Sequence, residues 1–254
     1  MDYITPSEAR SMSGLRLALT RGVPGPYSMS ARSIFDLRNV PYVAVEQIGA
    51  SDNPELKAWT GHRNAPVAMY NDESPRAGWL DILHLAQRLG SGPSLLPQDI
   101  KSRMLMFGLT NELIGESGLT WQLRLVMLGA GGPERAAQAA QQNPMYADYG
   151  YSESARQKAL SKAQSILEAF TGHVRQQHTA GSDYLIGNTL TALDVYWAYF
   201  SQIVAPLPDA QCPTPKGLRK SYEYCGQALG GVDDLLVTRR DWMFAHHLQL
   251  PLTF

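Results

Sequence analysis

The segment Gly25-Pro26-Tyr27-Ser28-Met29-Ser30-Ala31-Arg32 joins two short runs of different character. The run before it, residues 15–20, is apolar and predicts a β-strand, whereas residues 30–37 place apolar side chains on one helical face. The segment is therefore expected to form a strand-to-helix turn. Such a turn directs backbone N–H groups and hydroxyls beyond the helix N-terminus, which carries partial positive charge. We expect this turn to stabilise an anion or a thiolate.

The segments that follow continue an α/β pattern. Residues 42–48 are rich in β-branched and aromatic side chains and predict a second strand. Strand, helix and strand in this order favour a parallel pair with a right-handed crossover. A short helix is expected over residues 54–60, and a third strand over residues 64–70 with Pro66 near its start. A short fourth strand over residues 75–78 and a helix over residues 79–89 complete the unit.

A Gly-Ser-Gly-Pro-Ser stretch at residues 90–94 marks the expected domain boundary. It cannot continue a helix and has almost nothing to bury. Residues 1–13 are polar and show no periodicity, which predicts a loosely ordered extension. The expected division is an extension over residues 1–14, a first domain over 15–89, a linker over 90–97 and an all-helical domain over 98–254.

The second half of the chain carries a strong helix-start signal at residues 191–194, Thr-Ala-Leu-Asp. Thr191 at the N-cap and Asp194 three residues later form the pattern of a capping box. The helix that follows is apolar nearly all round and is expected in the core. In an earlier helix, Met104, Phe107 and Ile114 are expected near one face. The helical segments expected are residues 100–114, 120–128, 152–173, 192–204, 216–226 and 232–248.

Composition and charge narrow the classes of partner. The 254 residues are 44% hydrophobic, and 22 Lys and Arg are balanced by 23 Asp and Glu without a basic run. These numbers argue against nucleic acid or an anionic membrane as partner. The N-terminal residues lack targeting features, and no apolar run approaches the ~18 residues of a membrane span, so we expect a soluble cytoplasmic protein. Cys212 and Cys225 are expected to be reduced, and no metal site is expected.

Two motifs and the order of the elements resemble the soluble glutathione transferases. Ala65-Pro66-Val67 resembles the cis-proline step of that family, and Leu185-Ile186-Gly187 running into the capping box resembles a helix of its C-terminal domain. The resemblance covers nearly the whole chain from residue 15 onward. It implies a thioredoxin-like N-terminal domain, a C-terminal all-helical glutathione-transferase domain and a homodimer.

The resemblance also implies glutathione as co-substrate. Ala65 would offer its backbone N–H and C=O to the cysteinyl part, with Pro66 in the cis form. The family's Glu-Ser pair, which holds the γ-glutamyl group, would fall near Ala77 and Gly78, whereas a Glu-Ser pair occurs earlier. Either Ser74 caps the next helix and the pair still meets the ligand, or backbone N–H groups act there with Arg76 for the carboxylate. The residues expected to hold glutathione are Ser28, Asn64, Ala65, Pro66, Glu73, Ser74, Arg76, Gly78 and Trp79.

The family activates the glutathione sulfur through a Tyr, Ser or Cys near the end of the first strand, because a hydrogen-bond donor favours the thiolate. In this chain Gly25 occupies that position, which is a departure from the family pattern. Ser28 is the first candidate to replace the missing group, followed by Ser30 and Tyr27. The residues expected to contact the second substrate are Tyr27, Phe107, Asn111 and Trp121.

The function expected from the resemblance is attack of the glutathione thiolate on a small apolar electrophile, or reaction of a glutathione thioether. Thiol exchange by the protein itself is disfavoured because the first domain contains no cysteine. The alternative is a non-catalytic protein that uses the same fold to bind apolar ligands or a partner protein. Gly25 favours that alternative, and the three nearby hydroxyls favour the enzyme.

Overall fold

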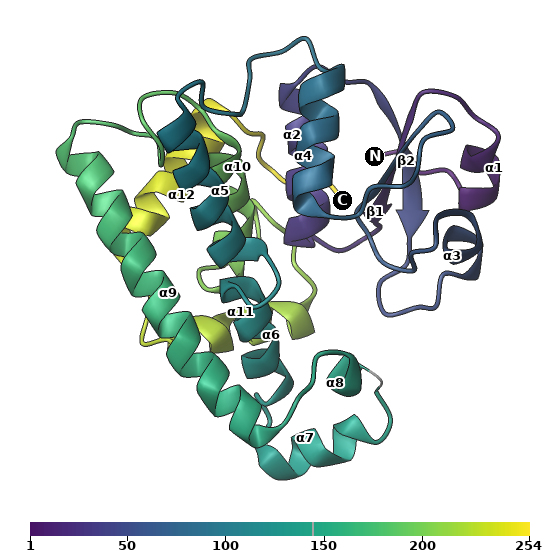
Figure 1. Cartoon of the computed structure of the whole chain (residues 1–254). Coiled ribbons are helices and arrows are strands. Elements are labelled where there is room, and N and C mark those ends of the chain that lie inside the picture. The colour runs from purple at the N-terminus through teal and green to yellow at the C-terminus, as the bar shows by residue number, and fades with distance from the viewer. Residues whose placement is uncertain (144) are drawn as a thin grey trace. The chain divides into compact units, whose positions relative to one another are not determined.

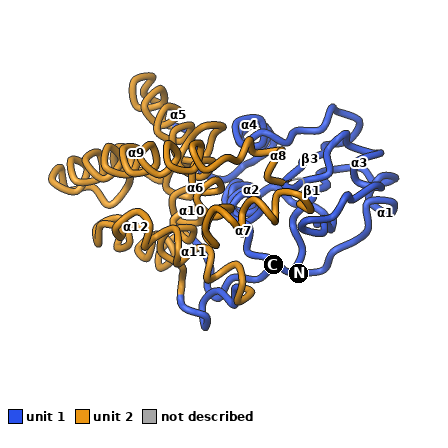
Figure 2. Tube along the Cα trace, turned by 90° about the horizontal axis from the view of Figure 1, so that it is seen from below, with its two compact units in different colours: residues 1–96, 208–214, 248–254 blue, residues 97–207, 215–247 orange. Residues whose placement is uncertain are grey.

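The computed structural model describes residues 1–143 and 145–254, which form two compact units. Unit 1 consists of residues 1–96, 208–214 and 248–254, and unit 2 of residues 97–207 and 215–247 (Figure 2). Two late segments of the chain thus return to the first unit. The domain limits expected from the sequence stay a prediction, because the contacts within each unit do not show which segments fold independently.

Unit 1 is built on a three-stranded sheet. Strands β1 (Leu15–Thr20) and β2 (Tyr42–Gln47) are parallel, as predicted, and β3 (Val67–Tyr70) pairs antiparallel with β1, giving the order β2-β1-β3. Helix α2 (Pro26–Leu37) connects the parallel strands, and α3 (Pro54–Thr60) and α4 (Trp79–Leu89) have the predicted bounds (Figure 1). The predicted fourth strand is wrong: it is one bridge between Ala68 and Arg76. Pro75 has no N–H to donate, and α4 is already capped at Gly78.

The N-terminal residues are ordered, which corrects the expectation of a loose extension. Helix α1 (Pro6–Arg10) begins with a capping box in which Glu8 Oε2 accepts the Thr5 N–H at 2.8 Å. Ile4 joins the sheet edge, since its N–H donates to Ala44 O at 3.1 Å. A helix of five residues is too short to show periodicity, so its sequence carries little signal of its packing.

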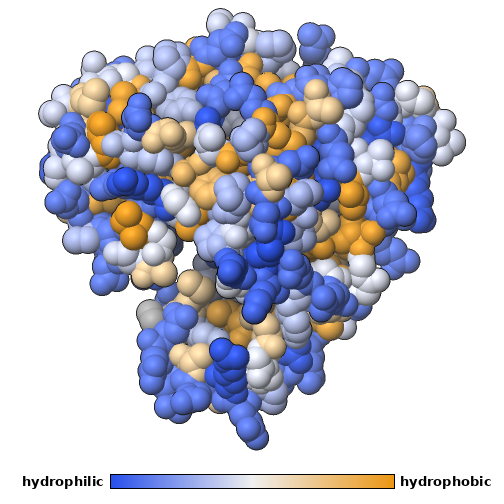
Figure 3. Space-filling view, turned by 180° about the vertical axis from the view of Figure 1, so that it is seen from behind, coloured by the Kyte–Doolittle hydropathy of each residue, from blue (hydrophilic) through white to orange (hydrophobic). Residues whose placement is uncertain are grey.

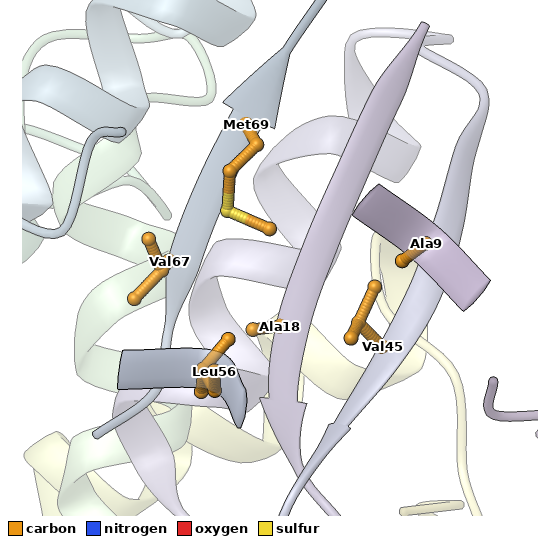
Figure 4. Packing of buried hydrophobic residues seen from close by; sticks show 6 residues of the cluster. All are labelled: Ala9, Ala18, Val45, Leu56, Val67 and Met69. Atoms are coloured by element: carbon orange, nitrogen blue, oxygen red, sulfur yellow. The ribbon is translucent and has the colours of Figure 1, made fainter. Parts of the chain in front are cut away.

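The hydrophobic core on one face of the sheet is formed by the three strands and two of the helices. Its side chains come from α1, β1, β2, α3 and β3 (Figure 4). Leu17 and Leu19 alternate with Ala18 along β1 and are also buried, so the sheet is covered on both faces. The cluster consists of Ala9, Ala18, Val45, Leu56, Val67 and Met69.

The glycine-rich stretch at residues 90–94 has almost nothing buried, as expected, but it is hydrogen-bonded to the end of α2. The Gly92 N–H donates to Arg38 O at 3.0 Å. The buried Arg38 guanidinium donates to the carbonyls of Gly90 at 2.6 Å, of Gln87 at 3.3 Å and of Gly92. A Cβ on Gly92 would lie 2.3 Å from Leu37 O, so glycine is needed for this close approach.

Unit 2 is helical in every regular element that the structure describes, as predicted. Helix α10 (Ala192–Phe200) is buried along its whole length and contacts α5 (Ile100–Ile114) and α12 (Asp234–His246). Met104 is 69% exposed, so the predicted apolar face of α5 is wrong at that residue. The elements are α5 (Ile100–Ile114), α6 (Leu119–Leu128), α7 (Pro133–Ala140), α8 (Met145–Asp148), α9 (Glu153–Thr179), α10 (Ala192–Phe200), η1 (Ser201–Ile203), α11 (Lys216–Ala228) and α12 (Asp234–His246).

The capping box at the start of α10 is confirmed, and it also holds the preceding loop. Asp194 Oδ2 accepts from the Thr191 N–H at 2.8 Å and from Thr191 Oγ1 at 2.7 Å. Asp194 Oδ1 accepts the Leu185 N–H at 2.7 Å. Burial raises the pKa of Asp194 to about 6. One carboxyl group therefore satisfies three donors that have no access to water.

Both cysteines are free, as predicted, and both are buried; burial raises the pKa of the Cys225 thiol to about 12. A thiol in that state is a poor nucleophile. Within residues 1–143 and 145–254, no helix has the length and apolarity needed to cross a membrane. The cytoplasmic location expected from the sequence stays a prediction.

Candidate functional site

The candidate site lies where the carboxyl ends of β1 and β2 meet the N-terminus of α2. Gly25 is the N-cap of α2, with φ −65° and ψ 122°, and Pro26 follows at the first helical position. These angles are open to any residue, so the backbone does not require glycine here. A Cβ on Gly25 would meet no described atom within 4 Å apart from its chain neighbours. The position expected to carry a reactive side chain is thus open space.

Two of the three hydroxyls expected to contact the sulfur are turned into the fold. Ser28 is 4% exposed, accepts the Thr20 N–H at 3.1 Å and donates to Thr20 Oγ1 at 3.3 Å. Ser30 is 1% exposed and donates to Tyr27 O at 3.2 Å. Tyr27 is half-buried at the start of α2. The catalytic roles of Ser28, Ser30 and Tyr27 stay predictions.

Thr20 and Gln47 extend this network, although the sequence argument did not select them. They are the last residues of β1 and β2 and face each other in the parallel register. Thr20 Oγ1 donates to Gln47 Oε1 at 2.8 Å, and Gln47 Nε2 donates to Ile48 O at 2.8 Å and Arg63 O at 3.3 Å. The sequence signal was a polar residue at the end of each predicted strand. The carboxyl ends of the strands are where α/β proteins bind ligands.

The loop before Pro66 is held by the same end of the sheet. The peptide bond between Ala65 and Pro66 is cis, as predicted, with Pro66 buried, Ala65 half-buried and Asn64 exposed. Asn53 Nδ2 donates to Arg63 O at 3.1 Å, so this carbonyl is bound by both Gln47 and Asn53. The loop that presents Ala65 is therefore fixed to the end of β2.

Arg63 is a cationic side chain in this loop that the sequence argument missed. Its Nη1 lies 4.0 Å from Oδ1 of the exposed Asp52, and its side chain is itself partly exposed. A partly exposed guanidinium in this loop can form a hydrogen bond with a carboxylate of a bound ligand. The sequence signal was its position, two residues before Ala65.

The structure excludes one of the two arrangements expected for the Glu-Ser pair. Because α4 begins at Trp79 with Gly78 as its N-cap, the alternative in which Ser74 caps the helix is wrong. Glu73 Oε2 lies 2.6 Å from Arg88 Nη2 and 2.7 Å from Arg76 Nη2. The hydrogen bond from Arg88, followed by the contacts with Arg76, holds the pKa of Glu73 below its usual range. Glu73 and Arg76 thus bind each other, and their roles toward a ligand stay predictions.

Three of the four residues expected to contact the second substrate belong to two helices of unit 2, and the fourth, Tyr27, belongs to α2. Phe107 is half-buried on α5, and Asn111 is exposed one turn later. Trp121 belongs to α6 and packs its ring against the edge of Tyr149, with a centroid distance of 5.0 Å. The structure therefore pairs Phe107 with Asn111 on one helix and gives Trp121 a contact of its own.

Comparison with known proteins identifies the fold. No protein-family model matches the sequence, and no curated protein matches it. Among solved structures, a glutathione transferase family member from Pseudomonas fluorescens pf-5, with two glutathione molecules bound, is similar with a TM-score of 0.64 and 15% identity, covering 97% of this chain and 98% of that one.

Two further structures agree with that finding. A glutathione S-transferase domain-containing protein from Marinobacter aquaeolei VT8 has a TM-score of 0.61 and 17% identity, over 92% of this chain and 100% of that one. A Tau class glutathione S-transferase from mango, Mangifera indica, has a TM-score of 0.54 and 21% identity, over 93% and 99%. Over nearly its whole length the chain therefore has the fold of the glutathione transferases, a thioredoxin-like unit followed by a helical one.

Proposed function

We propose that the chain is a glutathione transferase-like protein that binds glutathione as co-substrate where α2 begins. One observation carries this proposal: hydrogen bonds join the start of α2 to the loop before Pro66. Ser28 is bonded to Thr20, and Gln47 links Thr20 to the carbonyl of Arg63. The fold and the glutathione bound to the similar Pseudomonas fluorescens protein support glutathione as the ligand.

Each part of glutathione has a proposed partner. The backbone of Ala65 receives the cysteinyl part, with Asn64 beside it, and the sulfur lies at the first turn of α2. Arg63 receives the glycyl carboxylate. Either the Glu-Ser pair or the N-terminus of α4 receives the γ-glutamyl group, so Glu73, Ser74, Arg76, Gly78 and Trp79 remain its candidates.

The proposed reaction is attack of the glutathione sulfur on a small apolar electrophile. The thiol proton leaves to solvent, an S–C bond forms, and the leaving group departs with its electron pair. The N–H groups and the partial positive charge at the start of α2 favour the thiolate. Tyr27, Phe107, Asn111 and Trp121 are the proposed contacts of the electrophile, and a glutathione thioether is the alternative substrate.

Retention on immobilised glutathione tests the proposal. We expect the protein to be retained and to elute with free glutathione. The ultraviolet absorbance of the thiolate then gives the pKa of the bound thiol, and turnover of a chlorodinitrobenzene tests the reaction. Absence of binding at millimolar glutathione would overturn the proposed function.

Replacing Arg63 by alanine is expected to weaken glutathione binding about tenfold to a hundredfold, because a charge-assisted hydrogen bond contributes about 1.5–3 kcal/mol. Isothermal titration calorimetry measures the change. Arg21→Ala is the matched control, since Arg21 lies just beyond β1 and pairs with Glu46 at 2.7 Å. Equal affinities of Arg63→Ala and the unmodified protein would remove Arg63 from the site.

Non-catalytic binding is the second candidate function. The open position at Gly25 and the inward hydroxyls of Ser28 and Ser30 favour it, because they leave no serine hydroxyl beside the sulfur. Under this alternative the fold binds an apolar ligand or a partner protein. Retention on glutathione without turnover of any electrophile would support it over the enzyme.

A homodimer is the proposed assembly. Helix α5 exposes Ile100 (61%), Met104 and Leu105 (46%), which is a large apolar surface for one helix. Figure 3 shows that hydrophobic residues also reach the surface among hydrophilic ones on the face turned away from the view of Figure 1. Burial of the α5 side chains against a second copy would remove them from water.

Met104→Glu is expected to convert the dimer to a monomer, because a carboxylate would be buried without a partner in the interface. Size-exclusion chromatography with light scattering measures the mass. Met12→Glu is the control, since Met12 is an exposed methionine of unit 1 outside α5. A monomeric unmodified protein, or a dimeric Met104→Glu variant, would contradict this prediction.

A further inference from the structure

The amide of Gln47 has one orientation that satisfies its neighbours. Its Nε2 faces two carbonyl oxygens, Ile48 O at 2.8 Å and Arg63 O at 3.3 Å. Carbonyl oxygens only accept hydrogen bonds, so the NH₂ group must lie on their side. Gln47 Oε1, which only accepts, is thereby directed at Thr20 Oγ1, 2.8 Å away.

This orientation fixes the direction of two hydroxyl protons. Thr20 has a single hydroxyl proton and donates it to Gln47 Oε1, so Thr20 Oγ1 can act only as an acceptor toward Ser28. Ser28 Oγ already accepts the Thr20 N–H and donates its own proton to Thr20 Oγ1 at 3.3 Å. The chain of donation runs from Ser28 through Thr20 to Gln47, into the protein.

A sulfur atom at the start of α2 therefore meets no hydroxyl proton from Ser28 or Thr20, and Ser30 donates to the Tyr27 carbonyl. Beside this sulfur, a Cβ on Gly25 would meet no described atom within 4 Å apart from its chain neighbours. A thiolate is stabilised by hydroxyl donors, and here it receives no such stabilisation from Ser28, Thr20 or Ser30. A thioether sulfur is uncharged and a weak acceptor, needs no such donor, and requires room for its substituent.

On the basis of the proposed glutathione site, we infer that the protein prefers S-substituted glutathione, a thioether, to glutathione itself. Gln47 acts as a positioning residue that holds the two hydroxyl protons away from the sulfur. Gly25 provides the space for the substituent. The substrate class of the site is thus the glutathione thioether.

Calorimetry with glutathione and S-methylglutathione tests this preference. We expect S-methylglutathione to bind about threefold to fivefold more tightly, which is the gain from burying one methyl group. The thiol of bound glutathione is expected to be acidified only as far as the N–H groups of α2 acidify it, with no contribution from the hydroxyls of Ser28 and Thr20. Gly25→Ser places a hydroxyl in the open position and should reverse the preference, with about a tenfold rise in the acid dissociation constant of the bound thiol. Gly217→Ser is the control and should change neither value, because Gly217 is exposed and its Cβ position is also open.

Substitution of the hydroxyl residues distinguishes this proposal from activation of the bound thiol by a hydroxyl side chain. Ser28→Ala and Thr20→Val should leave the acid dissociation constant of the bound thiol unchanged. Gln47→Leu removes the acceptor that directs the chain, releases the proton of Thr20, and should raise that constant. A bound thiol that is already acidified in the unmodified protein, and that returns to the solution value in Ser28→Ala, Thr20→Val or Tyr27→Phe, would overturn the inference. Failure to bind either ligand would instead overturn the proposed glutathione site.

Discussion

Asp194→Ala is expected to lower the free energy of unfolding by about 4 kcal/mol. The carboxyl group accepts hydrogen bonds from two backbone N–H groups, those of Thr191 and Leu185, and from the Thr191 hydroxyl. A buried donor left without an acceptor costs about 1–3 kcal/mol, and loss of the N-cap interaction adds about 1 kcal/mol. Because α10 is buried along its length, water cannot replace the lost acceptor.

Urea unfolding followed by circular dichroism measures this loss, and the chain contains its own control. Glu8 forms the same capping box with Thr5 on α1, but both side chains are exposed. Glu8→Ala should therefore cause a much smaller loss, because water satisfies the Thr5 N–H. Similar losses in the two variants would show that burial is not the reason for the effect of Asp194.

The same carboxyl group predicts a dependence on pH. Its pKa is raised in the folded protein to about 6 from 3.8, so between these values the folded state binds more protons than the unfolded state. Stability from this group is therefore present at low pH and is lost as the pH rises through 6. The stability of the unmodified protein relative to Asp194→Asn should fall by about 2 kcal/mol from pH 4 to pH 7. A difference that rises over this range would contradict the raised pKa.

Arg38→Ala is expected to lower the free energy of unfolding by about 3 kcal/mol. The buried guanidinium donates to the carbonyls of Gly90, Gln87 and Gly92, and the variant leaves them without this donor. Loss of these hydrogen bonds would detach the end of α4 from the end of α2. Gly92→Ala tests the same junction from the other side, because the new Cβ would lie 2.3 Å from Leu37 O and should cost about 1–3 kcal/mol.

Arg88→Ala and Gly217→Ala are the controls for this pair. Arg88 is an exposed arginine of α4 that is bound to Glu73, and Gly217 has open space around its Cβ position. Both should have small effects on unfolding measured in urea. If Arg38→Ala unfolds at the same urea concentration as Arg88→Ala, the residues 90–94 act as a free linker after all.

Part of the candidate site could be predicted because its backbone conformation depends on residues that are neighbours in the sequence. The turn at Gly25 and the helix after it follow from short stretches of sequence, whereas the cis bond before Pro66 was implied by the resemblance to the glutathione transferases. The partners of the side chains could not be predicted, because Thr20, Gln47 and Arg63 meet only when the strand ends are brought together. The partner of Glu73 could not be predicted for the same reason, since this glutamate binds an arginine fifteen residues later on α4.

By itself, the sequence determined the elements whose signal lies within a few neighbouring residues. These are the parallel strands, the bounds of α3 and α4, the capping box at Thr191 and Asp194, and the helical character of unit 2. Tertiary structure alone decided the features that need a distant partner. These are the packing of α1, the attachment of residues 90–94 to Arg38, and the direction of the hydroxyl protons near Gly25. The physical reason is that periodicity and capping are encoded locally, whereas the direction of a hydrogen bond depends on every acceptor around it. The turn at residues 25–32 is therefore fixed as a helix start by its sequence, whereas the hydrogen bonds of Ser28 depend on Thr20 and Gln47, which lie outside it.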